Sequence, residues 1–194
     1  MQEMFDAGCD PAFYQKQGKS YAFPDLTTTL CPHCKADHLK KHGYYTRGLI
    51  TISFEGEILI KRYLCPECRQ TVSLLPSFCH PKRTYGIEVI FRLLVGFYIR
   101  MKTVCRVVTG FLLATEIECS RQLLLHYRRR IEQNFNSLAM GVTEIYDLRA
   151  PPVIERDNAR KKVGQLLSVI KSPRDDSLKI YKRTRTTYLT PFPI

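Results

Sequence analysis

The sequence lacks any long uninterrupted run of apolar residues. A helix that crosses a membrane needs about 18 or more of them in succession. The most apolar segment is residues 87–101, and it is interrupted or ended by Glu88, Arg92 and Arg100. The sequence also lacks the charged and apolar pattern of a secretory signal peptide. These absences argue against a membrane-spanning protein, and we expect a cytoplasmic protein with no membrane partner.

Paired cysteines are the most specific feature that is present. The cytoplasm keeps thiols reduced, so cysteine pairs there are more often metal ligands than disulfides. Two Cys-x-x-Cys pairs occur, CPHC at Cys31 and Cys34 and CPEC at Cys65 and Cys68. Together they can fill the tetrahedral shell of one Zn²⁺ and leave no position for water or substrate. We therefore predict one structural zinc ion, with four buried or redox-active cysteines as the alternative.

The segment between the cysteine pairs has the pattern of a β-hairpin. Apolar and polar residues alternate over residues 50–54 and again over 58–64, with Glu55-Gly56 between them. Such alternation around a glycine-containing turn favours two antiparallel strands, as in a zinc ribbon. His38 and His42 are rival metal ligands in the first arm. Since four cysteines already complete the shell, we expect both to be surface or strand residues.

The net charge of +12 is unevenly distributed. Residues 81–130 carry ten basic and three acidic side chains, and residues 151–194 carry ten basic and four acidic ones. The interval 131–150 is acidic overall. Clustered basic charge beside a zinc module is typical of a nucleic-acid-binding protein. A solvated basic surface is the alternative that charge alone leaves open.

After Gly86 the apolar residues recur at helical spacing. The expected elements are a helix over residues 87–101, a short helix over 102–110, a turn over 111–114 and a third helix over about 115–135. Thr115 and Glu118 have the spacing of a capping box, which marks the start of that third helix. This order is a helix-turn-helix pattern, whose last, basic helix can enter the DNA major groove. A plain helical bundle with a solvated basic face is the alternative.

Both ends of the sequence have weaker patterns. Residues 1–30 show no clear periodicity, and we expect an irregular lead-in. Beyond Ala139, Pro151-Pro152 marks a break, and residues 158–170 have the pattern of an amphipathic helix. The chain from Ser172 onward is polar and basic, so we expect a partly disordered tail.

Several stretches carry a family resemblance: CPHC, HGYYTR, KRYLCPECRQTVSLLPSF and the helical segment after them. They resemble the zinc-ribbon plus helix-turn-helix modules of bacterial insertion-sequence transposases, and more closely a family of short Gram-positive proteins built from that module. The resemblance covers about residues 31–135 and implies DNA binding, often at element ends. One departure is that Lys35 and Arg69 stand where a glycine commonly follows each cysteine pair.

A second departure concerns catalysis. A transposase needs a catalytic domain with three metal-binding carboxylates, but only about 55 residues follow Ala139. Their acidic residues lie in weakly patterned sequence, and they are Glu144, Asp147, Glu155, Asp157, Asp175 and Asp176. We therefore expect the DNA-binding half of such a protein without its enzyme.

The predicted fold is α+β: a small four-cysteine zinc ribbon of antiparallel strands, then a helix-turn-helix helical domain and a basic C-terminal tail. The expected domains are residues 1–30, 31–80, 81–139 and 140–194. The functional hypothesis is a zinc-stabilised DNA-binding protein of the bacterial nucleoid, associated with a mobile element or derived from one as a transcriptional regulator. Expected partners are double-stranded DNA, a transposase or other protein of the same element, and a second copy of the chain in a possible homodimer.

Arg121 and Gln122 are expected to contact base edges, because the first residues of a recognition helix reach them. Phosphate contacts are expected from Arg128, Arg129, Arg130, Lys182, Arg183 and Arg185. Three alternatives stay open: a protein–protein adaptor built on the ribbon, an RNA-binding protein, and a divalent-metal nuclease. The nuclease would use late carboxylates such as Asp147 and Asp157.

Overall fold

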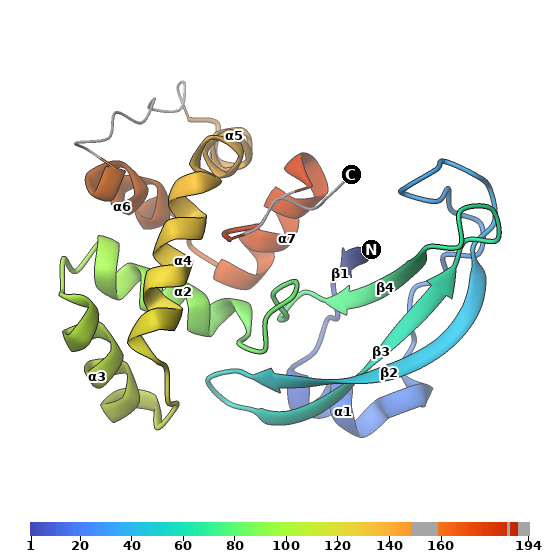
Figure 1. Cartoon of the computed structure of the whole chain (residues 1–194), viewed down its shortest axis with the longest axis horizontal. Coiled ribbons are helices and arrows are strands. Elements are labelled where there is room, and N and C mark those ends of the chain that lie inside the picture. Colours follow the sequence, from blue (N-terminus) through green and yellow to red (C-terminus); the bar gives the residue numbers. More distant parts are fainter. Residues whose placement is uncertain (149–158, 186, 190–194) are drawn as a thin grey trace. The chain divides into compact units, whose positions relative to one another are not determined.

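A computed structural model describes residues 1–148, 159–185 and 187–189 (Figure 1). The chain divides into two compact units, the first ending at Gly86 and the second beginning at Ile87. The first contains a four-stranded mixed sheet with the four cysteines, and the second contains six helices among the residues described. This composition confirms the α+β class. The boundary lies six residues beyond the expected end of the ribbon, because the connecting segment packs on the sheet.

The sheet of the first unit has the strand order β1-β4-β3-β2. Its strands are β1 (Gln2–Phe5), β2 (Lys40–Ile50), β3 (Glu55–Leu64) and β4 (Thr71–Pro76). The β2/β3 and β3/β4 pairs are antiparallel, as a ribbon requires, whereas β1 runs parallel to β4. The parallel strand makes the sheet mixed, and the sequence pattern did not predict it.

The hairpin is present, but its turn lies earlier than expected. The strand β2 ends at Ile50, and the Thr51 N–H donates to the Phe54 carbonyl at 2.7 Å to close the turn. Glu55 and Gly56 are strand residues, paired with Ile50 and Leu49. The prediction of a strand over residues 50–54 is therefore wrong. Alternating apolar residues continue through the turn, so periodicity alone could not locate it.

Residues 1–30 are not an irregular lead-in, because they contain β1 and the helix α1 (Pro11–Gln17). Asp10 caps α1 by accepting from the Phe13 N–H at 2.9 Å, and proline stands at the first helical position. The buried Tyr14 hydroxyl donates to the Leu59 carbonyl of β3 at 2.8 Å. The N-terminal segment thus completes the core of the first unit.

The segment after β4 is clamped to the hairpin by Arg47. Its guanidinium donates to the His80 carbonyl at 2.6 Å and also to the Arg83 carbonyl. The His80 side chain is completely buried, with Nδ1 at 3.0 Å from the Pro81 carbonyl. Burial lowers the pKa of His80 to about 3, so this imidazole is neutral in the folded unit at ordinary pH.

The second unit consists of helices packed around a shared apolar core. They are α2 (Ile87–Tyr98), α3 (Val104–Thr115), α4 (Arg121–Gln133), α5 (Phe135–Tyr146), α6 (Ala159–Val169) and α7 (Pro173–Thr184). The first three lie where three successive helices were expected, with shifted ends. No helix among the described residues is long and apolar enough to span a membrane.

The turn between α3 and α4 differs from the prediction. Residues 111–114 continue α3, and Thr115 ends it, donating to the Phe111 carbonyl at 2.8 Å. Glu116 takes a left-handed conformation, which terminates the helix. Ser120 then caps α4 by accepting from the Leu123 N–H at 3.1 Å. The predicted capping box at Thr115 is therefore wrong. Thr115 is the last residue of α3, and Ser120 caps the start of α4 instead.

The described residues after Ala139 contain more helix than expected. Helix α7 lies where a partly disordered tail was predicted. The buried Asp176 carboxylate accepts from the Lys171 and Ser172 N–H groups at 3.1 and 3.0 Å and from the Tyr146 hydroxyl, which fixes the start of α7. Beyond the helix, the buried Tyr188 hydroxyl donates to the Pro173 carbonyl at 2.9 Å. The predicted break at Pro151-Pro152, together with Glu155 and Asp157, lies outside the described residues.

Candidate functional site

The first cysteine pair forms a tight loop that precedes β2. The Lys35 N–H donates to the Cys31 carbonyl at 2.9 Å, and the Cys31 N–H donates to the Ala36 carbonyl at 2.8 Å. Lys35 has a left-handed backbone, with φ of 63°. These bonds turn the chain so that the sulfurs of Cys31 and Cys34 face the same side.

The second pair repeats this geometry directly after β3. The Arg69 N–H donates to the Cys65 carbonyl at 3.1 Å, and the Cys65 N–H donates to the Gln70 carbonyl at 3.0 Å. Arg69, like Lys35, is left-handed, with φ of 57°. Both knuckles thus need the conformation that glycine adopts most easily. Here a lysine and an arginine adopt this backbone conformation instead.

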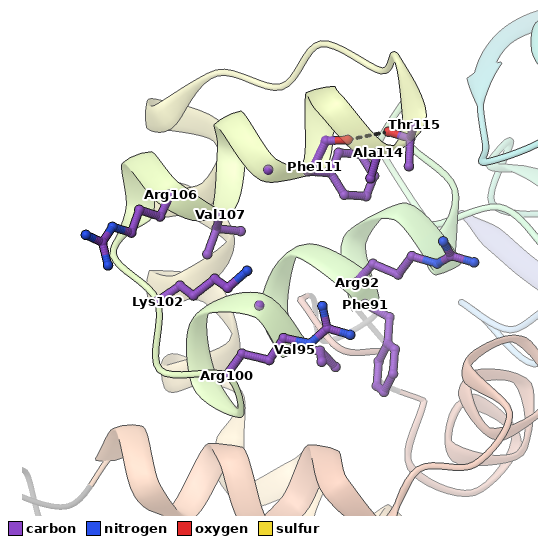
Figure 2. Close-up of a pocket in the computed structure, with 12 residues that line it drawn as sticks. Phe91, Arg92, Val95, Arg100, Lys102, Arg106, Val107, Phe111, Ala114 and Thr115 are labelled. Carbon is purple, nitrogen blue, oxygen red and sulfur yellow. Dashed lines mark hydrogen bonds between the residues drawn. The ribbon is translucent and has the colours of Figure 1, made fainter.

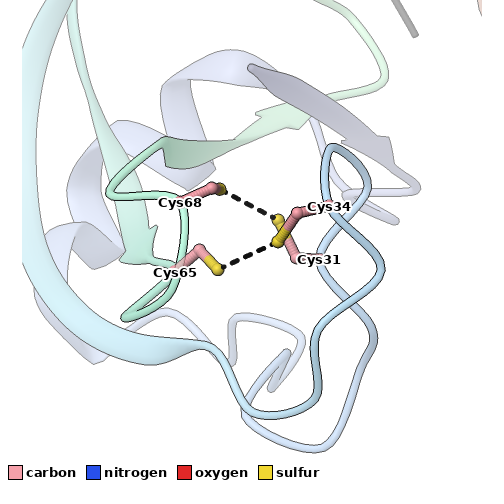
Figure 3. A group of neighbouring side chains, drawn as sticks. All are labelled: Cys31, Cys34, Cys65 and Cys68. Atoms are coloured by element: carbon pink, nitrogen blue, oxygen red, sulfur yellow. Dashed lines mark hydrogen bonds between the residues drawn. The ribbon is translucent and has the colours of Figure 1, made fainter.

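The two knuckles bring the four sulfurs together (Figure 3). Cys31 Sγ lies 3.7 Å from Cys68 Sγ, and Cys34 Sγ lies 3.6 Å from Cys65 Sγ. All four sulfurs are within 4.8 Å of one another. Sulfurs at about 2.3 Å from one tetrahedral metal ion would be about 3.8 Å apart. The cluster therefore fits a single metal ion, and neither rival histidine belongs to it.

The environment of the sulfurs favours thiolates but limits how many can form. Burial raises the pKa of Cys31, yet hydrogen bonds from the Cys34 and His33 N–H groups outweigh it and lower this pKa to about 7. The Gln70 N–H acts to lower the pKa of Cys68, but burial and the three neighbouring sulfurs raise it to about 12. Four adjacent thiolates repel one another, so a cation at the centre is needed to ionise all of them.

The centre lies near the protein surface. The side chains of Cys31 and Cys65 are completely buried, whereas Cys68 is half-buried and Cys34 is exposed. A four-cysteine set leaves no ligand position open. The four-cysteine cluster is therefore suited to a structural role: it ties the start of β2 to the end of β3. Within the residues described, it is the group of His, Cys, Asp and Glu side chains that can hold a metal.

The expected base-contacting residues lie where α4 begins. Arg121 is the first residue of α4, directly after the Ser120 cap, and Arg121 and Gln122 are both exposed. Successive helical residues are about 100° apart, so Arg129 lies on the same side of α4 and is exposed too. Leu124 is fully buried on the opposite side, together with Tyr127 and Ile131. Arg121 and Gln122, which were expected to contact base edges, thus lie on the exposed side of α4.

Arg128 has a different surrounding from Arg129. Its Nε lies 3.1 Å from Glu132 Oε1, and its guanidinium carbon lies 5.3 Å from the centre of the Phe97 ring. The same carboxylate oxygen accepts from the Tyr98 hydroxyl at 2.8 Å. Arg128 thus helps to pack α4 against α2, and its charge is partly balanced. The neighbouring Arg130 is half-buried.

The basic residues expected in the tail belong to the end of α7. Lys182 and Arg183 form its last turn, and Arg185 ends it with a left-handed backbone. Arg183 is paired with Glu144 of α5 at 3.2 Å. The Arg185 guanidinium donates to the Tyr181 hydroxyl at 2.9 Å. Arg183 and Arg185 therefore have contacts within the second unit, and Lys182 is exposed.

Sequence reasoning missed Leu125 as a surface residue. Its side chain is 46% exposed between Arg121 and Arg129 on the outward side of α4. The spacing i, i+4, i+8 of these three residues was visible in the sequence. No function was predicted for Leu125, because leucines in amphipathic helices usually face the core.

Comparison with known proteins assigns a domain but no activity. Residues 31–104 match the model of a domain of unknown function, DUF6431. The match begins at the first cysteine, includes both knuckles, β2–β4 and α2, and ends at the start of α3. No curated protein and no solved structure matches the chain. The match therefore continues past the end of the first unit into the second and does not extend to α4.

Proposed function

We propose that this chain is a zinc-stabilised DNA-binding protein related to transposases, either associated with a mobile element or derived from one as a transcriptional regulator. The exposed side of α4 carries the proposal: it presents Arg121, Gln122, Leu125 and Arg129, and it begins at a capped helix end. Arginine and glutamine can form paired hydrogen bonds with guanine and adenine edges, and an apolar side chain can contact the thymine methyl group.

Zinc is the ion that best suits the cysteine cluster. Four thiolates in tetrahedral geometry are the ligand set of structural zinc sites, and the sulfur separations of 3.6 and 3.7 Å agree with that geometry. In this proposal Cys31, Cys34, Cys65 and Cys68 hold one Zn²⁺. Its role is to stabilise the first unit, since the closed shell offers no position for catalysis.

The rest of the proposal concerns activity and surroundings. We infer no enzymatic role, a cytoplasmic location on bacterial DNA, and a transposase or other protein of the same element as partner. The clustered basic charge supports a location on DNA. The absence of an enzymatic role is supported by acidic residues after Ala139 that make structural contacts. Asp176 fixes the start of α7, and Glu144 pairs with Arg183.

Selection of bound sequences from a pool of random DNA duplexes tests the proposal. The full chain with its metal should enrich a defined motif within a few rounds. An Arg121→Ala/Gln122→Ala double variant, changed only at exposed positions, should fold normally and fail to enrich that motif. If the wild-type protein enriches no motif and retains no duplex at low salt, the DNA-binding proposal is wrong.

An adaptor role is the second candidate, and exposed leucines on α3 favour it. Leu113 is 81% exposed and Leu112 is 40% exposed on this helix. Exposed apolar side chains that lie close together often mark protein contacts. A Leu112→Ser/Leu113→Ser variant separates the two candidates. Under the adaptor hypothesis, the wild-type chain captures a protein partner with or without nuclease treatment, and the variant does not capture it. Under the DNA hypothesis, the variant still enriches the same DNA motif as the wild type.

A further inference from the structure

A groove lies between α2 and α3 within the second unit (Figure 2). It has a volume of about 290 Å³, close to the lower end for small-molecule sites, which is about 300 Å³. Its floor is apolar, with Val95 from α2 and Val107 and Phe111 from α3. Phe111 is buried there, whereas the Phe91 ring points away from α3 and packs against Tyr188. The groove therefore offers an apolar surface that is reachable from solvent.

All charged side chains that line this groove are basic. Between Glu88 and Glu116 the sequence contains four charged residues, and each of them lines the groove: Arg92, Arg100, Lys102 and Arg106. Lys102 extends between the two helices, whereas the Arg106 guanidinium extends outward from α3 (Figure 2). All four side chains are exposed. Because no carboxylate is among the lining residues, the charges that line the groove are all positive.

Gly110 supplies an independent observation. A glycine in the middle of a helix destabilises it by roughly 0.5–1 kcal/mol relative to alanine. Gly96, facing α3 from α2, has a packing reason, because a Cβ there would lie 3.1 Å from Val107 Cγ1. A Cβ on Gly110 would meet nothing within 4 Å. Packing in the chain thus does not require this glycine, and its missing side chain leaves the groove wall open beside the helix backbone.

We propose that the groove between α2 and α3 binds an amphipathic organic anion, a small molecule with an apolar body and a carboxylate, sulfonate or phosphate head. The body lies on Val95, Val107 and Phe111, close to the backbone at Gly110. The head lies at the rim, where Lys102 and the arginines neutralise it. DNA phosphates would use the cations and leave the apolar floor bare. This site is separate from the exposed side of α4 and does not depend on the proposed DNA binding.

Matched fluorescent probes test the site. Anilinonaphthalene sulfonate has an apolar body and an anionic head, N-phenylnaphthylamine has nearly the same body without the head, and inorganic sulfate supplies the head alone. The chain contains no tryptophan, so the probe signal has little protein background. We expect saturable binding of the sulfonate at one site. It should bind about tenfold or more tightly than either partial probe, as expected when a hydrogen bond to a charged group is added.

Variants then locate the binding. Gly110→Leu places a side chain in the open space and should weaken sulfonate binding about tenfold or more, whereas Gly110→Ala should fold equally well and weaken it less. Arg100→Gln/Lys102→Gln should reduce the affinity for the sulfonate and leave that for N-phenylnaphthylamine unchanged. Arg129→Gln, outside the groove, is the charge control and should change neither. Circular dichroism verifies that each variant retains its helices.

Three results would overturn the proposal. The first is sulfonate binding that Gly110→Leu, folded by circular dichroism, leaves unchanged. The second is inorganic sulfate that competes for the groove as tightly as anilinonaphthalene sulfonate binds to it, since the groove would then be a plain anion site. Duplex DNA provides the last arm. If Gly110→Leu weakens DNA binding as much as probe binding, the groove is a phosphate contact and the small-molecule proposal is wrong.

Discussion

The two units of this chain differ in what stabilises each of them. The ends of β2 and β3 in the first unit meet at four sulfurs within 4.8 Å of one another. The second unit has no such group of metal-ligating side chains among its described residues, and it buries Leu124, Tyr127, Ile131 and Phe135 completely or almost so. The comparison teaches that the first unit combines a four-cysteine cluster with its apolar core, whereas the described part of the second unit relies on apolar packing alone. We therefore expect that each unit can be disturbed without the other.

The largest effect is expected from losing the metal. Cys65→Ser removes a buried ligand, and structural zinc contributes apparent free energies on the order of 10 kcal/mol. The first unit should lose its protection against amide hydrogen exchange, while the helices of the second unit keep theirs. Cys105→Ser, which changes an exposed cysteine on α3, is the control and should keep both metal and protection. Equal loss of protection in both units would contradict the comparison.

The reverse experiment disturbs the second unit alone. Leu124→Ala creates a cavity at a fully buried position of α4 and should lower the free energy of unfolding of this unit by about 2–5 kcal/mol. Metal content, measured by elemental analysis, should stay at one ion per chain. Leu125→Ala, at the exposed neighbouring position, should change the stability by about 0.5 kcal/mol or less. A Leu124→Ala protein that loses its metal would show that the units are not independent.

Acid should weaken the first unit through His80 in addition to any effect on the metal. The lowered pKa of His80 means that the unfolded chain binds this proton more readily than the folded one. The stability due to neutral His80 is therefore complete above pH 6.5 and is lost as pH falls toward 3, by up to about 1.4 kcal/mol per pH unit.

The measurement is the difference between denaturation curves of wild type and His80→Gln across that range. Metal loss affects both proteins alike and cancels in the difference. Wild type should lose stability more steeply than the variant between pH 6 and pH 4. Parallel curves would mean that His80 is not the titrating group.

The smallest effect concerns the left-handed residues of the two knuckles. Lys35→Gly and Arg69→Gly should each stabilise the first unit by about 0.5–1 kcal/mol, because glycine avoids the left-handed penalty of roughly 1–2 kcal/mol and loses part of this gain to chain entropy. His33→Gly is the control: it lies in the first knuckle with an ordinary φ and should destabilise. Thermal melting of the metal-bound proteins measures all three. Destabilisation by both Lys35→Gly and Arg69→Gly would contradict this account of strain.

Local patterns in the sequence predicted the two knuckles, but they misplaced the hairpin turn and the start of α4. The knuckles need only six residues each, and their bonds join residues four or five apart, so Cys-x-x-Cys spacing was sufficient. The helical spacing after Gly86 likewise predicted helices where α2, α3 and α4 lie. The strand β1 was missed because its partner is distant: the Met1 amino group donates to the Thr71 carbonyl. Such a pairing leaves no periodic signal near residue 1.

The roles of the basic residues were harder to predict for the same reason. Arg128, Arg183 and Arg185 have partners from other helices or one helical turn away, and these contacts depend on tertiary packing. Helix α7 was missed because its sequence is mostly polar, and its start is fixed by Asp176. Charge counting treated all these arginines alike. The structure distinguishes Arg121 and Arg129, which are exposed on one side of α4.

The most direct test of the central claim is a fluorescence anisotropy titration of duplex DNA over a range of salt concentrations, with metal-bound wild type, Arg121→Ala and Arg129→Ala. The account predicts that Arg121→Ala loses about 1–3 kcal/mol of preference for a selected site over random duplex. Arg129→Ala should weaken both duplexes equally and reduce the slope of log affinity against log salt by about 0.9. Wild-type protein that shows no salt-dependent binding to any duplex would contradict the account.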